Sequence, residues 1–308
     1  MRAALFGTPY FAIPCLEALH ACPDIELVAV VTQCDRPVGR KAVMTPPPIK
    51  VRAQELGVPV LQIEKINLEE SLQQLRALDC DVFITAAYGQ ILRQSLLDIP
   101  KYGVINVHAS LLPKYRGAAP IAWSIKCGET VTGVSTMFTD VGVDTGDILL
   151  QSEVAIEDTD TTETLTEKLA KCGAETLIET LHQLADGTLV RIPQDNELAT
   201  RTPMIKKTHG KIDFAMTARE IDCLVRAMTP WPGTWTTMGG KQLKIFGVEK
   251  VDGHGTPGTI IDGDFTIACG DGAIRPTEIQ LEGSKRMKTQ DFLRGRKVEA
   301  GTVLGDEQ

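Results

Sequence analysis

Residues 1–9 read Met-Arg-Ala-Ala-Leu-Phe-Gly-Thr-Pro, and they set the pattern of the fold. The apolar run from Ala3 to Phe6 predicts a buried strand. Gly7, Thr8 and Pro9 then supply a tight turn, a capping hydroxyl and a proline at the first position of a helix that we expect to reach Leu19. Because a strand that turns directly into a helix is the repeating unit of parallel α/β sheets, we expect this segment to open such a sheet.

Strand-like and helix-like segments alternate through the first half of the chain. Short β-branched runs predict strands at 27–31, 58–63, 82–86 and 104–107. Helical periodicity predicts helices at 68–78, 90–97, 118–127 and 161–185, the last closed by Asp186 and Gly187. This alternation is typical of a Rossmann-like α/β domain with a parallel sheet, which we place at residues 1–188.

The pattern changes after Gly187. Residues 189–206 have little periodicity and contain two prolines, which predicts a linker over the surface. After a predicted helix at 218–228, short alternating runs are separated by Gly-Gly and Asp-Gly turns. Turn signals at this spacing predict a small antiparallel β-barrel, OB-like in kind, at residues 207–308.

The composition excludes several classes of protein. With 43% hydrophobic and 23% charged residues over 308 positions, the chain is neither disordered nor collagen-like. It has no apolar run of 18 residues and no signal-peptide pattern, so we expect a cytoplasmic protein with no membrane partner. No two cysteines are closer than seven residues, which leaves no zinc-ribbon spacing, and we expect no metal.

The distribution of charge is more informative than the net charge of −8, which by itself argues against generic nucleic-acid binding. Residues 1–200 carry a net charge of −10, whereas residues 201–308 carry +2. Four basic residues and no acid lie within 201–211, and residues 285–297 hold six basic residues and one acid. We expect a local basic surface there; solvated surface lysines without a partner are the alternative.

Asn106 and His108 are the first candidates for chemistry. Residues two apart on a strand share a face, so the amide and the imidazole point the same way near the carboxyl end of a sheet strand, where open α/β folds place ligands. An amide donor beside an imidazole suits an acyl-transfer transition state. A histidine satisfied by backbone hydrogen bonds is the simpler interpretation of the pair taken alone.

A glycine-containing acidic loop follows at 140–147. Its carboxylates at Asp140, Asp144 and Asp147 lack the alternate spacing and terminal Glu of a calcium loop, so a metal is disfavoured. A carboxylate near an imidazole more often tunes the tautomer of the ring or moves protons itself.

Two motifs carry a resemblance to a known family. Asn106-Val-His108-Ala-Ser110-Leu-Leu-Pro113 and Asp140-x-Gly-x-Asp144-Thr-Gly-Asp147 resemble the 10-formyltetrahydrofolate-dependent formyltransferases. Asp35-Arg-Pro-x-Gly-Arg40, Pro46-Pro-Pro-Ile-Lys50, Arg116-Gly-Ala-Ala-Pro120 and the C-terminal domain resemble the branch that acts on methionyl initiator tRNA. The resemblance covers nearly the whole chain.

The resemblance implies a set of site residues. Asn106, His108 and Asp144 match the catalytic trio of the family. The residues that match its folate-binding segments are Ser110, Leu111, Leu112, Pro113, Tyr88, Gly89, Ile91, Asp140 and Val141. The expected donor is 10-formyltetrahydrofolate, the expected acceptor is methionyl initiator tRNA, and we expect the enzyme to act as a monomer.

The resemblance also implies where the tRNA binds. The loop from Gln33 to Ile49 matches the one that the family places against the acceptor stem, with Arg40 as its wedge. The expected tRNA contacts are Arg36, Arg40, Lys41, Lys206, Lys207 and Lys211. Cys34 stands where relatives often have proline, and Ala42 and Val43 replace frequently basic residues, so this loop has less charge for gripping RNA. We expect it to be short of apolar surface and to order on the tRNA.

The residue types then predict a mechanism without a covalent enzyme intermediate. The acceptor amine attacks the formyl carbon, Asn106 and protonated His108 donate to the oxygen that becomes negative, and Asp144 with a water relays the proton. Three alternatives stay open at this point. They are a formyltransferase that acts on a sugar-nucleotide amine, a non-catalytic RNA-binding protein, and a folate-dependent hydrolase that releases formate.

Overall fold

The computed structural model describes residues 1–39 and 41–305, and the chain divides into two compact units. Unit 1 comprises Met1–Gly117, Val131–Ala155 and Thr166–Thr202, and unit 2 comprises Ala118–Thr130, Ile156–Leu165 and Pro203–Gln308. Two short segments, Ala118–Thr130 and Ile156–Leu165, therefore pack with the C-terminal part of the chain. The domain boundaries expected at residues 188 and 206 stay a prediction.

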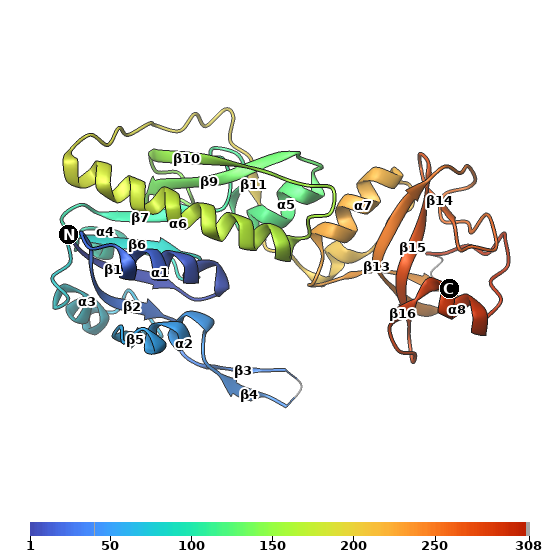
Figure 1. Ribbon diagram of the computed structural model, residues 1–308, viewed down its shortest axis with the longest axis horizontal. Helices are drawn as coiled ribbons and strands as arrows, with labels where there is room; N and C mark the ends of the chain where they lie inside the picture. The colour runs from blue at the N-terminus through green and yellow to red at the C-terminus, as the bar shows by residue number, and fades with distance from the viewer. Residues whose placement is uncertain (40, 306–308) are drawn as a thin grey trace. The chain divides into compact units, whose positions relative to one another are not determined.

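Unit 1 is built on a seven-stranded sheet with the order β10-β9-β7-β6-β1-β2-β5 (Figure 1). Its strands are β1 (Arg2–Gly7), β2 (Glu26–Thr32), β5 (Val60–Gln62), β6 (Val82–Ala86), β7 (Val104–His108), β9 (Val131–Phe138) and β10 (Ile148–Ala155). The five strands from β5 to β7 are parallel, and β9 and β10 add an antiparallel edge. All of β6 and most of β1 are buried, as continuous apolar runs in parallel sheets should be. The predicted parallel α/β sheet is confirmed.

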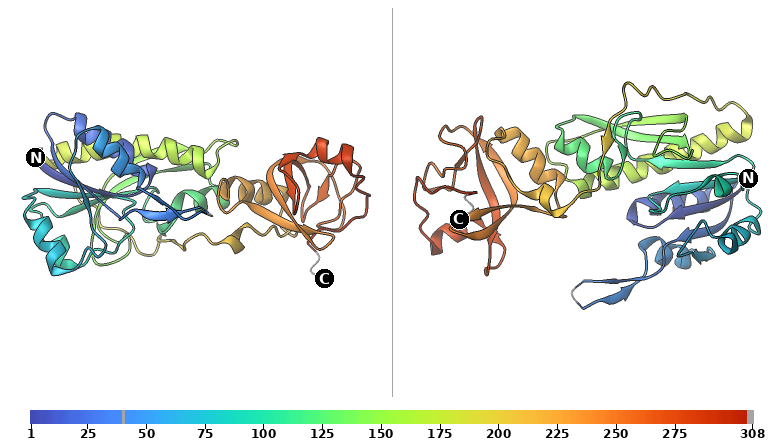
Figure 2. Two further views of the ribbon diagram at one scale, coloured as in Figure 1. Left: turned by 90° about the horizontal axis from the view of Figure 1, so that it is seen from below. Right: turned by 180° about the vertical axis from the view of Figure 1, so that it is seen from behind.

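Helices cover both faces of this sheet. They are η1 (Tyr10–Ala12), α1 (Ile13–Ala21), α2 (Pro48–Glu55), α3 (Glu69–Arg76), α4 (Gln94–Leu97) and α6 (Thr162–Asp186), whose first turn belongs to unit 2. α1 and α6 lie on one face and α3 on the other (Figure 2). Among the helices of the described part of the chain, none is long and apolar enough to cross a membrane.

The helix predicted at 90–97 begins only at Gln94. The side chain of Asn67 explains the delay, because its Nδ2 donates to the carbonyl of Ile91 and its Oδ1 accepts from the amide of Arg93. Gln90 is also engaged, accepting from the amide of Ile66 and donating to the carbonyl of Ile63. Side-chain hydrogen bonds of this kind compete with helix formation.

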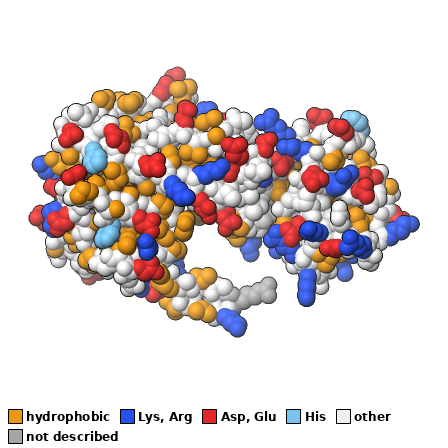
Figure 3. Space-filling view, viewed as in Figure 1, with side chains coloured by type: hydrophobic (Ala, Val, Ile, Leu, Met, Phe, Trp, Pro, Cys, Tyr) orange, Lys and Arg blue, Asp and Glu red, His pale blue; other side chains and the backbone are white. Residues whose placement is uncertain are grey.

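A two-stranded hairpin that the sequence analysis did not predict extends from unit 1. Its strands are β3 (Arg36–Val38) and β4 (Val43–Thr45), paired antiparallel. The expectation of a loop short of apolar side chains is wrong, because Val38, Val43 and Met44 are each more than half exposed there. Hydrophobic side chains over the hairpin are visible in Figure 3.

Unit 2 is an antiparallel sheet with helices beside it. Its elements are α5 (Pro120–Lys126), η2 (Lys207–Gly210), α7 (Ala218–Ala227), β12 (Thr234–Met238), β13 (Lys241–Val251), β14 (Ile267–Ala268), β15 (Ala273–Leu281), β16 (Met287–Lys288) and α8 (Thr289–Gly295). The strand order is β12-β13-β15-β14, and β16 also pairs with β15. α7 packs against α5 and β13. The predicted antiparallel C-terminal sheet is confirmed.

Irregular segments close this sheet on itself. At β12, the carbonyl of Thr237 accepts a hydrogen bond from the amide of Gly305. The neighbouring amide of Leu304 donates to the carbonyl of Gly258. The carbonyl of Thr259 then accepts from the amide of Ala268 in β14. These bonds connect the two end strands of the sheet, which gives unit 2 the barrel form expected from its turn signals.

Candidate active site

The order of the parallel strands changes direction at β1, because the chain continues to β2 on one side and later returns to β6 on the other. The hydroxyl of Thr8, just after β1, donates to the carbonyl of Tyr88, just after β6, at 2.9 Å. The Thr8 hydroxyl is therefore not the helix cap that the sequence predicted; the chain instead forms η1 before α1. Open α/β sheets bind ligands at the carboxyl ends of strands near such a switch point.

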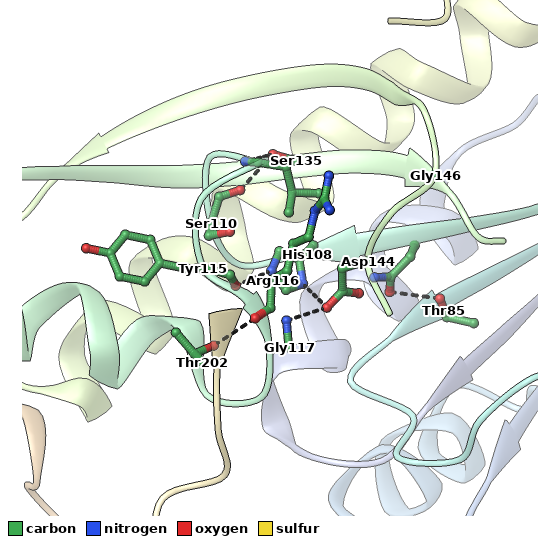
Figure 4. A network of polar contacts seen from close by, with 12 residues as sticks. Thr85, His108, Ser110, Tyr115, Arg116, Gly117, Ser135, Asp144, Gly146 and Thr202 are labelled. Carbon is green, nitrogen blue, oxygen red and sulfur yellow. Dashed lines mark hydrogen bonds and ion pairs between the residues drawn. The ribbon is translucent and has the colours of Figure 1, made fainter. Parts of the chain in front are cut away.

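Asn106 lies on β7, next to β6, and its amide orientation is fixed. The Thr85 hydroxyl donates to Oδ1 of Asn106 at 2.8 Å (Figure 4). Asn106 is partly exposed, whereas the neighbouring residues Ile105 and Val107 are buried. Because Oδ1 is engaged and Nδ2 has no hydrogen-bond partner among the described residues, the amide presents a free N–H donor. The sequence analysis did not identify Thr85.

His108, at the end of β7, is 6% exposed. Its Nε2 lies 3.0 Å from the carbonyl oxygen of Tyr115. Since a carbonyl only accepts, Nε2 carries the hydrogen, and Nδ1 is the nitrogen that remains for chemistry. Nδ1 faces Oδ2 of Asp144 at 3.7 Å.

Asp144 completes the group from the loop between β9 and β10. Its Oδ2 accepts from the amide of Gly117 at 2.7 Å, and its side chain is 17% exposed. Its φ of 54° is in the left-handed region, which Asp tolerates better than most residues. Loop geometry therefore brings the Asp144 carboxylate and the His108 ring together from segments 36 positions apart in sequence.

The residues expected to bind folate have different surroundings. The hydroxyl of Ser110 is buried and donates to the carbonyl of Lys114 at 2.7 Å. Leu112 packs with Met137 and Ile148, and the ring of Tyr88 is buried against Phe6.

Others of this set lie at the surface or in special backbone conformations. Ile91 and Val141 are 78% and 70% exposed. Gly89 has a φ of 87°, a conformation that residues with a side chain rarely adopt, so a substitution there would strain the backbone. Leu111 and Pro113 are partly exposed.

A cavity of about 560 Å³ opens beside Asp140 in unit 1. Leu97, Val104, Phe138, Tyr102 and Arg191 are among its lining residues. A cavity of this size is in the range that small ligands occupy. His108 is not among the residues that line it, so the cavity adjoins the 140–147 loop rather than the imidazole.

The residues expected to contact tRNA are exposed where the structure describes them. On unit 1, Arg36 donates to Gln33 Oε1, Lys41 is exposed, and Arg40 lies outside the described residues. On unit 2, Lys206 and Lys207 are exposed, and the Lys211 ammonium lies 5.8 Å from the centre of the Trp235 ring.

One group of possible metal ligands occurs within residues 1–39 and 41–305. Donor atoms of Cys22, Asp24 and His182 lie within 4.8 Å of one another, with Asp24 exposed. None of these residues belongs to the group around His108.

Comparisons with known proteins match both halves of the chain. A formyl transferase family model matches residues 1–181, and a model of the formyl transferase C-terminal domain matches residues 204–297. The methionyl-tRNA formyltransferase of Citrifermentans bemidjiense is 49% identical over 99% of this chain and 96% of that protein. That of Acetivibrio thermocellus is 47% identical over 99% of this chain and all of that protein.

Solved structures share the fold at lower identity. An N-formyltransferase from Helicobacter canadensis, solved with folinic acid and dTDP-3-aminofucose, superposes with a TM-score of 0.64. It is 20% identical, with 93% of this chain and 99% of that one covered. WlaRD, a sugar 3N-formyl transferase, gives a TM-score of 0.66 at 19% identity, with 92% and 99% covered.

Proposed function

The chain belongs to the formyl transferase family, and from that premise we propose that it transfers the formyl group of 10-formyltetrahydrofolate to the amino group of methionyl initiator tRNA. The relatives that are 45–49% identical over nearly the whole chain are methionyl-tRNA formyltransferases. The sugar formyltransferases are 19–20% identical, which favours tRNA over a sugar nucleotide as the acceptor. The folate supplies the formyl group and is consumed as a substrate.

The observation that carries the chemistry is the pair of donors on β7. The free N–H of Asn106 and, in the imidazolium form, the Nδ1–H of His108 belong to residues on one face of the strand, where both can donate to the oxygen of the formyl group. That oxygen becomes negative when the amine attacks the carbon. Donors fixed before the reaction stabilise such a charge without reorganisation, and losing one typically costs about 10² to 10³ in rate.

Asp144 serves the proton transfers. The amine loses one proton as its bond to the formyl carbon forms, and the folate nitrogen gains one as its bond to that carbon breaks. The Asp144 carboxylate faces His108 Nδ1 at 3.7 Å and stabilises the imidazolium. The same carboxylate, directly or through a water, accepts the proton from the amine and passes it on to the folate nitrogen, a role that contributes about 10² to 10⁴ in rate.

Several residues fit the folate. Exposed Ile91 and Val141 offer apolar surface, and the cavity beside Asp140 offers space of suitable size for part of a small ligand. The hydroxyl of Ser110 is committed to Lys114 O, so we assign it to shaping the 110–113 loop and assign the folate contacts to the backbone and to Leu111.

We also propose that the enzyme is a cytoplasmic monomer that binds tRNA through Arg36, Arg40 and Lys41 on unit 1 and Lys206, Lys207 and Lys211 on unit 2. All eight cysteines are free thiols, which supports a reducing compartment.

One assay tests the function. Formyl transfer from 10-formyltetrahydrofolate is measured with methionyl initiator tRNA, with uncharged tRNA, with a dTDP-amino sugar and with no acceptor. We expect product only with the charged tRNA. Transfer to the sugar would identify the sugar-nucleotide alternative, formate release without an acceptor would identify the hydrolase, and folate-independent tRNA binding without turnover would identify an RNA-binding protein.

A further inference from the structure

The segment after α6 contributes Gln194 to the surroundings of Asp144. Gln194 is half-buried within an otherwise exposed stretch. Its Oε1 accepts from Arg116 Nε at 2.9 Å, and its Nε2 donates to the carbonyls of Asp144 at 3.0 Å and Gly146 at 2.7 Å. Because a guanidinium only donates and a carbonyl only accepts, these partners determine the orientation of the amide.

Arg116 anchors the hydrogen-bond network around Gln194. It is 3% exposed, its Nη1 donates to Asn196 Oδ1 at 2.9 Å, and its Nη2 has no hydrogen-bond partner among the described residues. Burying a guanidinium against neutral amides is costly, so this contact is poorly suited to a purely stabilising role. It does hold the Gln194 amide rigidly against the loop that carries Asp144.

The carboxylate and the backbone carbonyl of Asp144 are therefore both held by residues of β8 (Arg116–Gly117). The Gly117 amide holds the carboxylate, and the Arg116 side chain holds the backbone carbonyl through Gln194. β8 is itself paired in parallel with β11 (Arg201–Thr202). Asp144 has a left-handed φ, and such a conformation persists where the surrounding hydrogen bonds hold it.

We infer that Gln194 is a positioning residue for the reaction, which holds the Asp144 carboxylate at His108 from a fixed anchor on Arg116. The inference rests on the proposed function. It assigns a role in the reaction to a residue of the 189–206 segment, which the sequence pattern predicts only as a linker.

The test is a double-mutant cycle, because a residue that acts through Asp144 loses its effect when Asp144 is changed. Gln194→Ala removes all three hydrogen bonds. Gln194→Glu keeps an acceptor for Arg116 and removes the donors to the loop. Gln183→Ala, at a partly exposed position of α6 where the side-chain amide bonds only Glu179 among the described residues, is the matched control. Each variant is made in the wild-type and Asp144→Asn backgrounds, with kcat, KM and thermal unfolding measured.

We expect both Gln194 variants to lower kcat about 10- to 100-fold in the wild-type background, the range expected for misplacement of about 1 Å, with KM for the tRNA changed less than about threefold. In the Asp144→Asn background the same changes should lower kcat less than about twofold. An equal loss of kcat in both backgrounds, or a loss of kcat that follows the fall in unfolding temperature, would overturn the positioning role. A wild-type enzyme without formyl transfer would overturn the proposed function and this inference with it.

Discussion

The Thr85 hydroxyl donates a 2.8 Å hydrogen bond to Oδ1 of Asn106, across two adjacent parallel strands of the sheet. Thr85 and Asn106 are register partners on β6 and β7, so the main-chain ladder itself sets their distance. This contact engages the amide oxygen and leaves Nδ2 as the free donor of the side chain. The orientation of the amide that we propose as a donor to the formyl oxygen thus depends on the hydroxyl of a neighbouring strand.

Replacing Thr85 by Val should therefore lower turnover. Valine keeps the shape of the side chain and removes the donor, so the amide of Asn106 loses its fixed orientation. We expect kcat to fall about tenfold or more, because a misoriented donor loses part of the effect of an oxyanion donor. Thr85→Ser keeps the hydroxyl and should retain most of the activity. Steady-state kinetics of the two variants measure this. Thr180→Val removes a buried hydroxyl elsewhere in unit 1 and controls for general loss of stability; a Thr85→Val enzyme with normal kcat would show that the orientation is fixed by something else.

Changes to the proposed catalytic residues should act on the transition state rather than on folate binding. We expect Asn106→Ala, His108→Ala and Asp144→Asn each to lower kcat by about two orders of magnitude. Binding of 10-formyltetrahydrofolate, measured by calorimetry, should change much less, because these groups bind the developing charge. A residue whose variant turns over at a near-normal rate when chemistry limits the reaction has been assigned the wrong role.

Local sequence patterns predict the parts of the fold that depend on local physics. The buried strands β1 and β6 are largely apolar runs, and α6 has a clear period and a Gly187 stop, so their positions can be predicted from neighbouring residues in the chain. The delayed start of α4 cannot be predicted this way. It depends on Asn67, whose side chain reaches the backbone of Ile91 and Arg93 only after the chain has folded.

The same distinction applies to the site. The two-residue spacing places Asn106 and His108 on one face of any strand. The approach of Asp144 to His108 depends on a left-handed residue and on the Gly117 amide, and no local pattern gives that distance. Thr85 and Gln194 carry no motif and gain their roles only from strand register and from the return of the 189–202 segment to unit 1.

Removing two basic residues from unit 2 should weaken tRNA binding and its dependence on salt. Lys206 and Lys207 are exposed, and each phosphate contact releases counterions when RNA binds. We expect Lys206→Ala with Lys207→Ala to reduce the slope of log affinity against log salt by about two, uniformly across tRNAs. Filter binding over a range of salt concentrations measures the slope. A double variant at the exposed residues Lys65 and Lys168 of unit 1 should leave the slope unchanged. If the slope fell with this control and not with the Lys206 and Lys207 variant, the RNA surface would lie elsewhere.

Thiol reactivity should follow burial. Desolvation raises the pKa of the Cys15 thiol to about 12 and that of Cys269 to about 11, since burial disfavours the charged thiolate that reacts. At pH 8 we expect iodoacetamide to modify exposed Cys127 first and to reach Cys15 and Cys269 only after unfolding. Peptide mapping by mass spectrometry checks the order. Enzyme modified at Cys127 alone should retain formyl transfer; loss of activity would indicate that the Cys127 thiol takes part in the reaction.

The base of the β3–β4 hairpin offers a way to test its role in tRNA recognition. Lys50 Nζ bonds both carboxylate oxygens of Asp35, at 2.8 and 3.0 Å, directly before β3. The hydrogen bond from Lys50, followed by one from Gln62, holds the pKa of the Asp35 carboxyl below its usual range. A lowered folded-state pKa means that the ionised anchor is fully present above the unfolded value near 3.8 and is lost only as pH falls through the folded value. Between pH 6 and 8 the anchor should therefore contribute no pH dependence.

Lys50→Met keeps the length of the side chain and removes its charge. Because Asp35 then has no ammonium to fix the start of the hairpin, residues Arg36 and Lys41 lose their defined position relative to the sheet. We expect KM for methionyl initiator tRNA to rise about three- to tenfold, the size of a modest positioning effect, while binding of 10-formyltetrahydrofolate stays unchanged. Arg52→Met is the matched control, since Arg52 lies on the same helix, α2, and pairs with Glu17 and Glu55 at the surface. Equal effects of the two substitutions would mean that α2 as a whole, or simply positive charge near the hairpin, accounts for the loss, and the anchoring role of Lys50 would be wrong.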